Sequence, residues 1–96
     1  MYIEEIRTLT NLPTETLVEI VELGIVEPDG QNLDSWTFSD IMLLRIIRAA
    51  RISRDLEINY AGVALALSLI DELELLKMEN KSLRRLIDRH MCSGSN

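Results

Sequence analysis

Residues 59–90 read NYAGVALALSLIDELELLKMENKSLRRLIDRH, and this stretch decides the architecture. We predict one continuous helix over it. At 1.5 Å per residue such a helix would run roughly 48 Å, well beyond the diameter of a domain of this size. Its second half must therefore pack against a partner.

The second half of this helix carries the seam of a short coiled coil, because its residues recur at alternating spacings of four and three. The seam residues are Leu69, Leu73, Leu76, Asn80, Leu83 and Ile87, followed by His90. No other stretch predicts a helix of that length, so the pattern favours a homodimer over an intramolecular hairpin. About three heptads is short for an autonomous coiled coil, so we expect further packing through Gly62, Ala66 and the heads.

Asn80 interrupts the apolar seam. A single asparagine there costs stability but fixes register and oligomeric state. We favour this structural role over ligand binding, which is the alternative.

Three shorter helices are predicted ahead of the long one. Residues 3–10 have a short apolar pattern that ends at Asn11, and residues 14–23 place apolar side chains at i, i+3 and i+4 before Gly24. Ser39 suits the N-cap of a helix over residues 40–56. In that helix we expect a core stripe of Ile41, Leu44, Ile47 and Ile52.

Residues 25–38 predict a small β wing. They contain Pro28, the turn pair Asp29-Gly30 and an alternating aromatic pattern over residues 36–38. The expected fold is all-α, with a helix-turn-helix, this wing and a long C-terminal helix. We predict a head over residues 1–58, a dimerisation helix over 59–90 and a disordered tail over 91–96.

Charge is unevenly distributed along the 96 residues, whose net charge is −6. Residues 1–40 hold nine acids against Arg7 alone, whereas four arginines fall within residues 41–60. An acidic surface repels phosphate, so a partner of the first third should be basic and DNA binding is not expected. A single cysteine, Cys92, and the lack of an apolar leader or membrane span indicate a cytoplasmic chain with no membrane association.

The sequence offers little catalytic chemistry. One histidine, His90, excludes a two-histidine metal site, and the glycines form no phosphate-binding motif. Asp71, Glu72 and Glu74 could suggest acid chemistry, but on a long helix such a cluster is more often a solvated flank. We expect no enzyme activity, no cofactor and no metal.

The order of these elements resembles the MerR-like helix-turn-helix superfamily, and within it the CbpM chaperone modulators most closely. The resemblance covers the chain to about residue 87 and rests on LGIVEP at 23–28, WTFSD at 36–40, GVALAL at 62–67 and LKMEN at 76–80. The first motif is shared with MerR-type transcription factors. The aromatic wing joined to the GVALAL helix is more specific to the modulators. The superfamily also favours antiparallel dimer helices, although the sequence itself leaves the orientation open.

The chain departs from the DNA-binding members of that superfamily at two places. Their second helix typically carries an Arg-Tyr pair where this chain has Val18-Glu19, and their wing offers an arginine where Trp36 stands. We interpret Trp36 as packing the wing onto the core. The alternative to a modulator is a MerR-like transcriptional regulator that binds DNA through a basic partner or through Arg45 and Arg48. We expect the arginines at 45, 48, 51 and 54 to have a structural role, in ion pairs with nearby acids.

The resemblance to CbpM implies a partner and a mechanism. CbpM-like proteins bind the J-domain of the DnaJ-type co-chaperone CbpA and inhibit it, and J-domains engage Hsp70 (DnaK) through a basic helix. An acidic dimer could compete for that helix. The candidate contacts are Glu19, Glu22, Asp71, Glu72 and Glu79.

Overall fold

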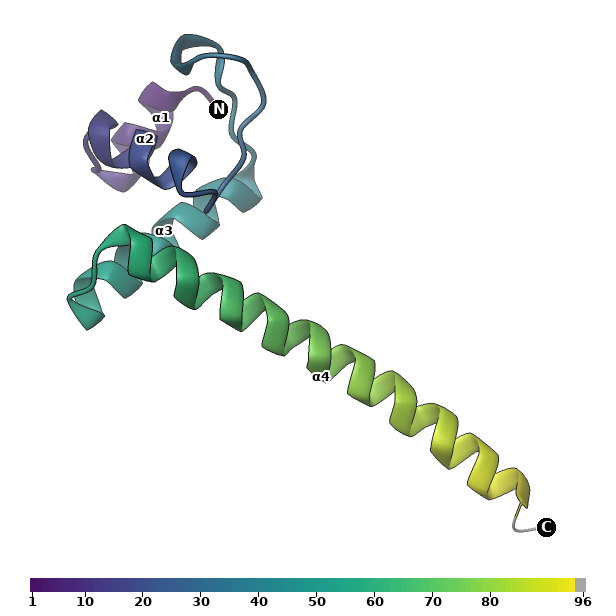
Figure 1. Cartoon of the computed structure of the whole chain (residues 1–96). Coiled ribbons are helices and arrows are strands. Elements are labelled where there is room, and N and C mark those ends of the chain that lie inside the picture. The colour runs from purple at the N-terminus through teal and green to yellow at the C-terminus, as the bar shows by residue number, and fades with distance from the viewer. Residues whose placement is uncertain (95–96) are drawn as a thin grey trace.

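The computed structural model describes the backbone of residues 1–94 and the side chains of residues 1–90. A small helical head carries one long projecting helix, and the molecule measures 63 × 29 × 20 Å (Figure 1). Within the described residues the elements are α1 (Ile3–Thr10), α2 (Thr14–Glu22), a 3₁₀ turn η1 (Leu33–Ser35), α3 (Asp40–Leu56) and α4 (Tyr60–Gly94).

The first two helices form where local signals predict them. Asn11 ends α1 in the left-handed conformation, with φ 56° and ψ 31°, and its N–H donates to the Arg7 carbonyl at 2.8 Å. α2 begins directly after Pro13 and ends one residue earlier than predicted. Gly24 then adopts a φ of +77°, which a residue with a side chain rarely does, and this lets the chain turn back toward the core.

The predicted β wing over residues 25–38 is not confirmed, because the segment forms isolated bridges and no strand. Asp29 and Thr37 exchange both backbone hydrogen bonds, at 3.2 and 2.8 Å, but the ladder goes no further. Toward the tip, Asn32 and Ser35 cap η1 reciprocally. Toward the base, the Phe38 N–H donates to the Met1 carbonyl at 2.7 Å. The segment is therefore a looped arm held by short bridges.

Trp36 packs this arm onto the core, as predicted. Its ring meets the ring of Phe38 edge to face, with centroids 6.4 Å apart and an interplanar angle of 88°. Phe38 is buried and Trp36 is half-buried against the same cluster.

The predicted start of α3 is confirmed. Ser39 is its N-cap, and the Ser39 hydroxyl oxygen accepts a hydrogen bond from the Met42 N–H at 3.2 Å. The predicted core stripe of α3 is wrong at two positions, because Ile41 is 78% exposed and Leu44 is 65% exposed. Ile47 and Ile52 are half-buried. The fully buried residues of α3 are Ile46 and Ala49.

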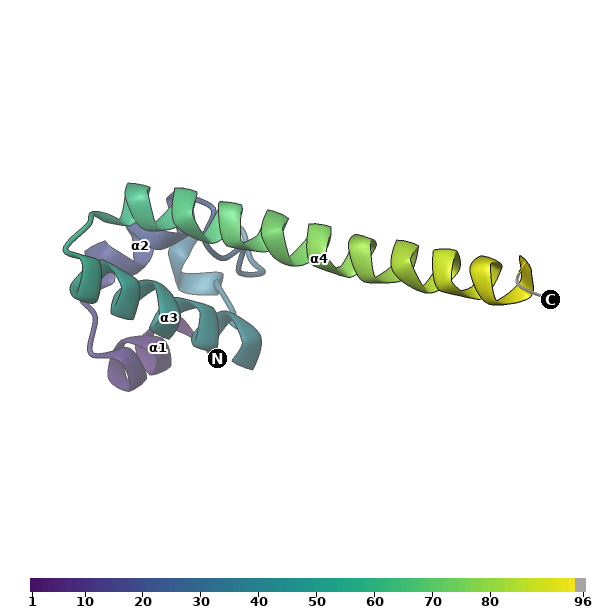
Figure 2. The ribbon, with the colours of Figure 1, turned by 90° about the horizontal axis from the view of Figure 1, so that it is seen from below.

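The core lies where α1, α2 and α3 meet the start of α4 (Figure 2). Ten buried apolar side chains form it: Ile6, Leu17, Ile20, Ile25, Val26, Phe38, Ile46, Ala49, Val63 and Leu67. Each helix thus contributes one face to a single small cluster.

Only the first turns of α4 belong to the head. The Asn59 side-chain oxygen caps the helix by accepting from the Gly62 N–H at 2.9 Å. Val63 and Leu67 are buried, whereas every described side chain from Asp71 to His90 is exposed. The helix continues to Gly94, past the predicted end at His90. The predicted disordered tail thus begins as helix, and residues 95–96 lie outside the described residues.

Candidate partner-binding surfaces

The acidic side chains of the head all face solvent. α2 turns Leu17 and Ile20 into the core and leaves Glu15, Glu19 and Glu22 exposed on its outer side. The remaining six acids among residues 1–40 are also exposed: Glu4, Glu5, Glu27, Asp29, Asp34 and Asp40. The negative charge of the first third is therefore displayed on the surface, where it can act on an approaching partner.

Tyr60, the first residue of α4, lies in the field of one of these acids. Burial raises the pKa of the Tyr60 phenol above its usual 10.0, and the nearby Glu19 carboxylate raises it further, while a hydrogen bond with Ser53 opposes both effects. Glu19 is thus an exposed carboxylate whose charge also reaches the junction of α2 and α4.

The five predicted J-domain contacts fall in two separate places. Glu19 and Glu22 share the outer side of α2. Asp71, Glu72 and Glu79 are exposed on α4, whose C-terminal half projects beyond the head (Figure 1). The two groups therefore belong to different helices of the chain.

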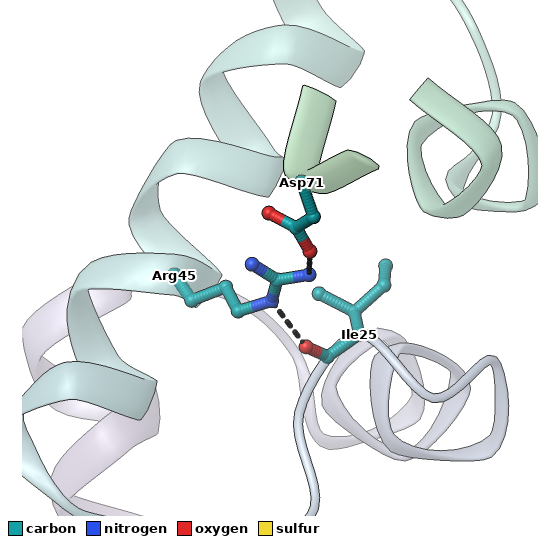
Figure 3. A network of polar contacts seen from close by, with 3 residues as sticks. All are labelled: Ile25, Arg45 and Asp71. Atoms are coloured by element: carbon teal, nitrogen blue, oxygen red, sulfur yellow. Dashed lines mark hydrogen bonds and ion pairs between the residues drawn. The ribbon is translucent and has the colours of Figure 1, made fainter. Parts of the chain in front are cut away.

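Asp71 differs from the other candidates because it already has a partner. The Arg45 guanidinium donates to the Asp71 carboxylate at 3.0 Å and, through Nε, to the Ile25 carbonyl at 2.6 Å (Figure 3). The two charged side chains remain 32% and 50% exposed. Arg45 thus connects three parts of the chain: α3 itself, α4 through Asp71, and the segment that follows α2 through Ile25. The contact therefore helps to set the direction in which α4 leaves the head.

The predicted seam residues of α4 are all exposed in the single chain. The apolar ones are 47–58% exposed: Leu69, Leu73, Leu76, Leu83 and Ile87. At about 100° per residue, Leu69 lies about 200° around the helix from the buried Leu67, so the seam faces away from the head. A second helix could therefore lie along the seam without displacing the head.

Sequence reasoning missed several exposed apolar residues. Leu65, Leu75, Met78 and Leu86 are exposed on α4 outside the predicted seam. Ile41 and Leu44 are exposed on α3, although we expected them in the core.

Within the described residues, two of the four arginines of α3 form ion pairs and two do not. Arg45 binds Asp71, and Arg54 lies 3.5 Å from its neighbour Asp55. Arg48 and Arg51 are exposed and make no ion pair or hydrogen bond within the part of the chain that the structure describes. General pairing with acids is therefore wrong for two of the four. The engagement of Arg45 also weakens its predicted alternative role in DNA binding.

The described residues contain no group of three metal-ligating side chains of the histidine, cysteine or carboxylate type. None of their helices is long and apolar enough to cross a membrane. The exposed surfaces with a marked charge or apolar character are the acidic side of α2, the seam of α4 and the side of α3 that carries Ile41 and Leu44.

Comparisons with known proteins identify the family of the chain. The family described as MerR HTH family regulatory protein matches residues 1–85. The chaperone modulatory protein CbpM of Pseudomonas putida strain GB-1 is 41% identical over 88 residues, covering 88% of this chain and 87% of the relative. CbpM of Coxiella burnetii strain Dugway is 40% identical over 83 residues, covering 86% and 78%. The chain therefore belongs to the CbpM family of chaperone modulatory proteins, within the MerR helix-turn-helix regulatory proteins.

Proposed function

We propose that this protein is a chaperone modulator that binds the J-domain of a DnaJ-type co-chaperone and inhibits it. The observation that carries the proposal is the exposed carboxylate row of α2, Glu15, Glu19 and Glu22, in a chain of the CbpM family. The relatives' name gives the chaperone-modulating role. The charge of this surface supplies the partner's chemistry, which is a basic helix.

Charge would control the rate of association at this surface, and apolar contact would control the affinity. The acids accelerate encounter with a cationic helix and disfavour anionic competitors. Lasting affinity needs apolar burial beside them. Leu23 is exposed immediately after Glu22, and Val18 and Val21 are half-buried on the same helix, so apolar surface adjoins the carboxylates.

The protein would inhibit the co-chaperone by occupying the basic helix of its J-domain. A J-domain engages Hsp70 through its basic helix, so a modulator on that helix competes with Hsp70. The competition is reversible, because it involves no covalent chemistry. Excess Hsp70 should therefore overcome the inhibition.

The protein would act as a homodimer. The support is the row of half-exposed apolar side chains along the seam of α4, facing away from the head. Leaving so long an apolar row in water is costly for a monomer, and pairing two seams buries it. A dimer presents two α2 surfaces to its targets.

Two neighbouring leucines test the seam. Leu76 is 58% exposed and Leu75 is 57% exposed, but only Leu76 lies on the seam. We expect Leu76→Asp to shift the mass in light scattering toward that of a monomer, and Leu75→Asp to leave it unchanged. Equal effects of the two substitutions, or none from either, would refute the seam.

Matched charge reversals test the acidic surface. We expect Glu19→Lys/Glu22→Lys on α2 to weaken J-domain binding by roughly tenfold or more at low salt. Glu72→Lys/Glu79→Lys makes the same charge change on α4 and measures the contribution of that group. Glu4→Lys/Glu5→Lys on α1 is the control for net charge alone. If the α1 pair weakens binding as much as the α2 pair, the effect is long-range and α2 is not the binding surface.

A further inference from the structure

The outer face of α3 carries four side chains in one row. Ile41, Leu44, Arg48 and Arg51 advance by three, four and three residues, the spacing that keeps side chains on one side of a helix. The row is about 15 Å long at 1.5 Å per residue. Its first half is apolar and its second half is cationic. We call these four residues the α3 row.

The α3 row makes no visible contribution to the fold. Ile41 and Leu44 are more exposed than any apolar residue of the predicted seam. Arg48 and Arg51 are exposed and have no ionic partner within the described residues, although the chain has a net charge of −6. Structural demands on α3 are met on its other side by Ile46 and Ala49. The composition of the row therefore needs another explanation.

A hollow adjoins the cationic half of the row. It has a volume of about 240 Å³ and is lined by Leu9 and Thr10 of α1 and by Ile47, Ala50, Arg51 and Arg54 of α3. Leu9 is itself largely exposed. The hollow thus extends the row toward α1 with a lining that mixes apolar side chains with two guanidinium groups, which suits a helix that carries both apolar and acidic side chains.

The α3 row lies apart from the two surfaces described above. In Figure 2, α3 is in front, between α4 and α1, with α2 behind them. The helix contacts both α1 and α4. The exposed acids of α2 and the arginines of the α3 row therefore belong to different helices of the head, and the seam lies on the side of α4 that faces away from the head.

We propose that the α3 row docks an acidic amphipathic helix of a protein partner, at a site separate from the α2 surface and independent of J-domain binding. Charge complementarity selects this occupant, because two unpaired arginines call for carboxylates. The apolar half selects a protein over nucleic acid, since Ile41 and Leu44 offer nothing to a phosphate backbone. A helix antiparallel to α3 fits the row when two carboxylates stand opposite the arginines and two apolar side chains stand opposite Ile41 and Leu44.

The test uses a synthetic helical peptide of about 18 residues, long enough to hold a helix. On an alanine and glutamine background the peptide carries Glu, Glu, Leu and Leu, in order from its N-terminus. When it lies antiparallel to α3, these side chains face Arg51, Arg48, Leu44 and Ile41 respectively. A control peptide has Lys in place of both Glu. Titration into the full chain is followed by the methyl NMR signals of Ile41 and Leu44. We expect these signals to shift with the Glu peptide and the Lys peptide to bind at least about tenfold more weakly.

Two variants of the protein complete the experiment. Arg48→Glu/Arg51→Glu should reverse the preference, so that the Lys peptide binds better than the Glu peptide. Lys81→Glu/Arg85→Glu makes the same charge change on the distant part of α4 and should leave the preference intact. Circular dichroism checks that both variants are folded, which is expected because all four positions are exposed.

Several outcomes would overturn the proposal. Absence of shifts with the Glu peptide, or equal binding of the two peptides, removes the docking site. Binding of duplex DNA that is lost in Arg48→Glu/Arg51→Glu would assign the row to nucleic acid. A fall in oligomeric mass of the Ile41→Ser/Leu44→Ser variant would assign it to a second copy of this chain.

Discussion

Arg45 forms two polar contacts whose contributions to the unfolding free energy should differ. Replacing Arg45 with Met keeps most of the aliphatic stem and removes both hydrogen bonds, to the Ile25 carbonyl at 2.6 Å and to Asp71 at 3.0 Å. Replacing Asp71 with Asn removes only the charge of one partner. The two substitutions should therefore differ in cost.

The magnitudes follow from exposure. A charged donor on a partly buried carbonyl contributes about 1.5–3 kcal/mol. The ion pair contributes less, about 0–1 kcal/mol, because Asp71 is 50% exposed and solvent screens it. We thus expect Arg45→Met to destabilise by about 2–3 kcal/mol and Asp71→Asn by about 0.5 kcal/mol. At about 4–8 °C per kcal/mol for a chain of this size, the former is easily measured.

The assay is thermal and denaturant unfolding of both single variants and the double variant, all at one protomer concentration because a dimer's stability depends on it. The coupling free energy between the two sites should not exceed about 1 kcal/mol. An Asp71→Asn variant as unstable as Arg45→Met would show that the ion pair, and not the carbonyl contact, accounts for most of the stabilisation by Arg45.

Three further predictions concern packing, the seam and pH. Ile46→Ala, at a fully buried site, should cost about 2–5 kcal/mol, whereas Ile41→Ser should change the unfolding free energy by no more than about 0.5 kcal/mol; a reversed order would contradict the placement of α3. Asn80→Leu should tighten self-association and admit species larger than a dimer in sedimentation, and an unchanged profile would exclude Asn80 from the seam. The raised pKa of Tyr60 keeps the folded phenol protonated where the unfolded one ionises, so stability should fall as pH rises above about 10. Between pH 8 and 11 the unfolding free energy of Tyr60→Phe should therefore fall less than that of the wild-type protein. Identical pH dependence of the two proteins would refute the raised pKa of Tyr60.

The helix boundaries could be predicted because they depend on local signals. Asn11 tolerates the left-handed conformation that ends α1, and Ser39 caps α3 with its own side chain. The stripe of α3 could not be predicted in the same way. Apolar residues surround this helix, and only packing against α1 and α4 decides that Ile46 is buried while Leu44 is exposed. The extent of pairing in the arm could not be predicted either, because Thr37 pairs with Asp29 on one side and with Tyr2 on the other, and the second contact comes from a distant part of the chain.

The candidate surfaces could be predicted in part. Charge patterning gave the acids of α2, because an amphipathic helix with Leu17 and Ile20 inside must turn Glu19 and Glu22 outward. It could not distinguish Asp71 from its neighbours, because the ion pair to Arg45 depends on how α3 meets α4. The homodimer, the J-domain partner and the domain limits remain predictions.

The most direct test of the account is a calorimetric titration of a purified CbpA-type J-domain into the wild-type protein, at low and at moderate salt. We expect saturable binding that weakens as salt rises, because the exposed carboxylates of α2 should face a basic helix. Absence of binding at either salt concentration, with the protein folded, would contradict the account.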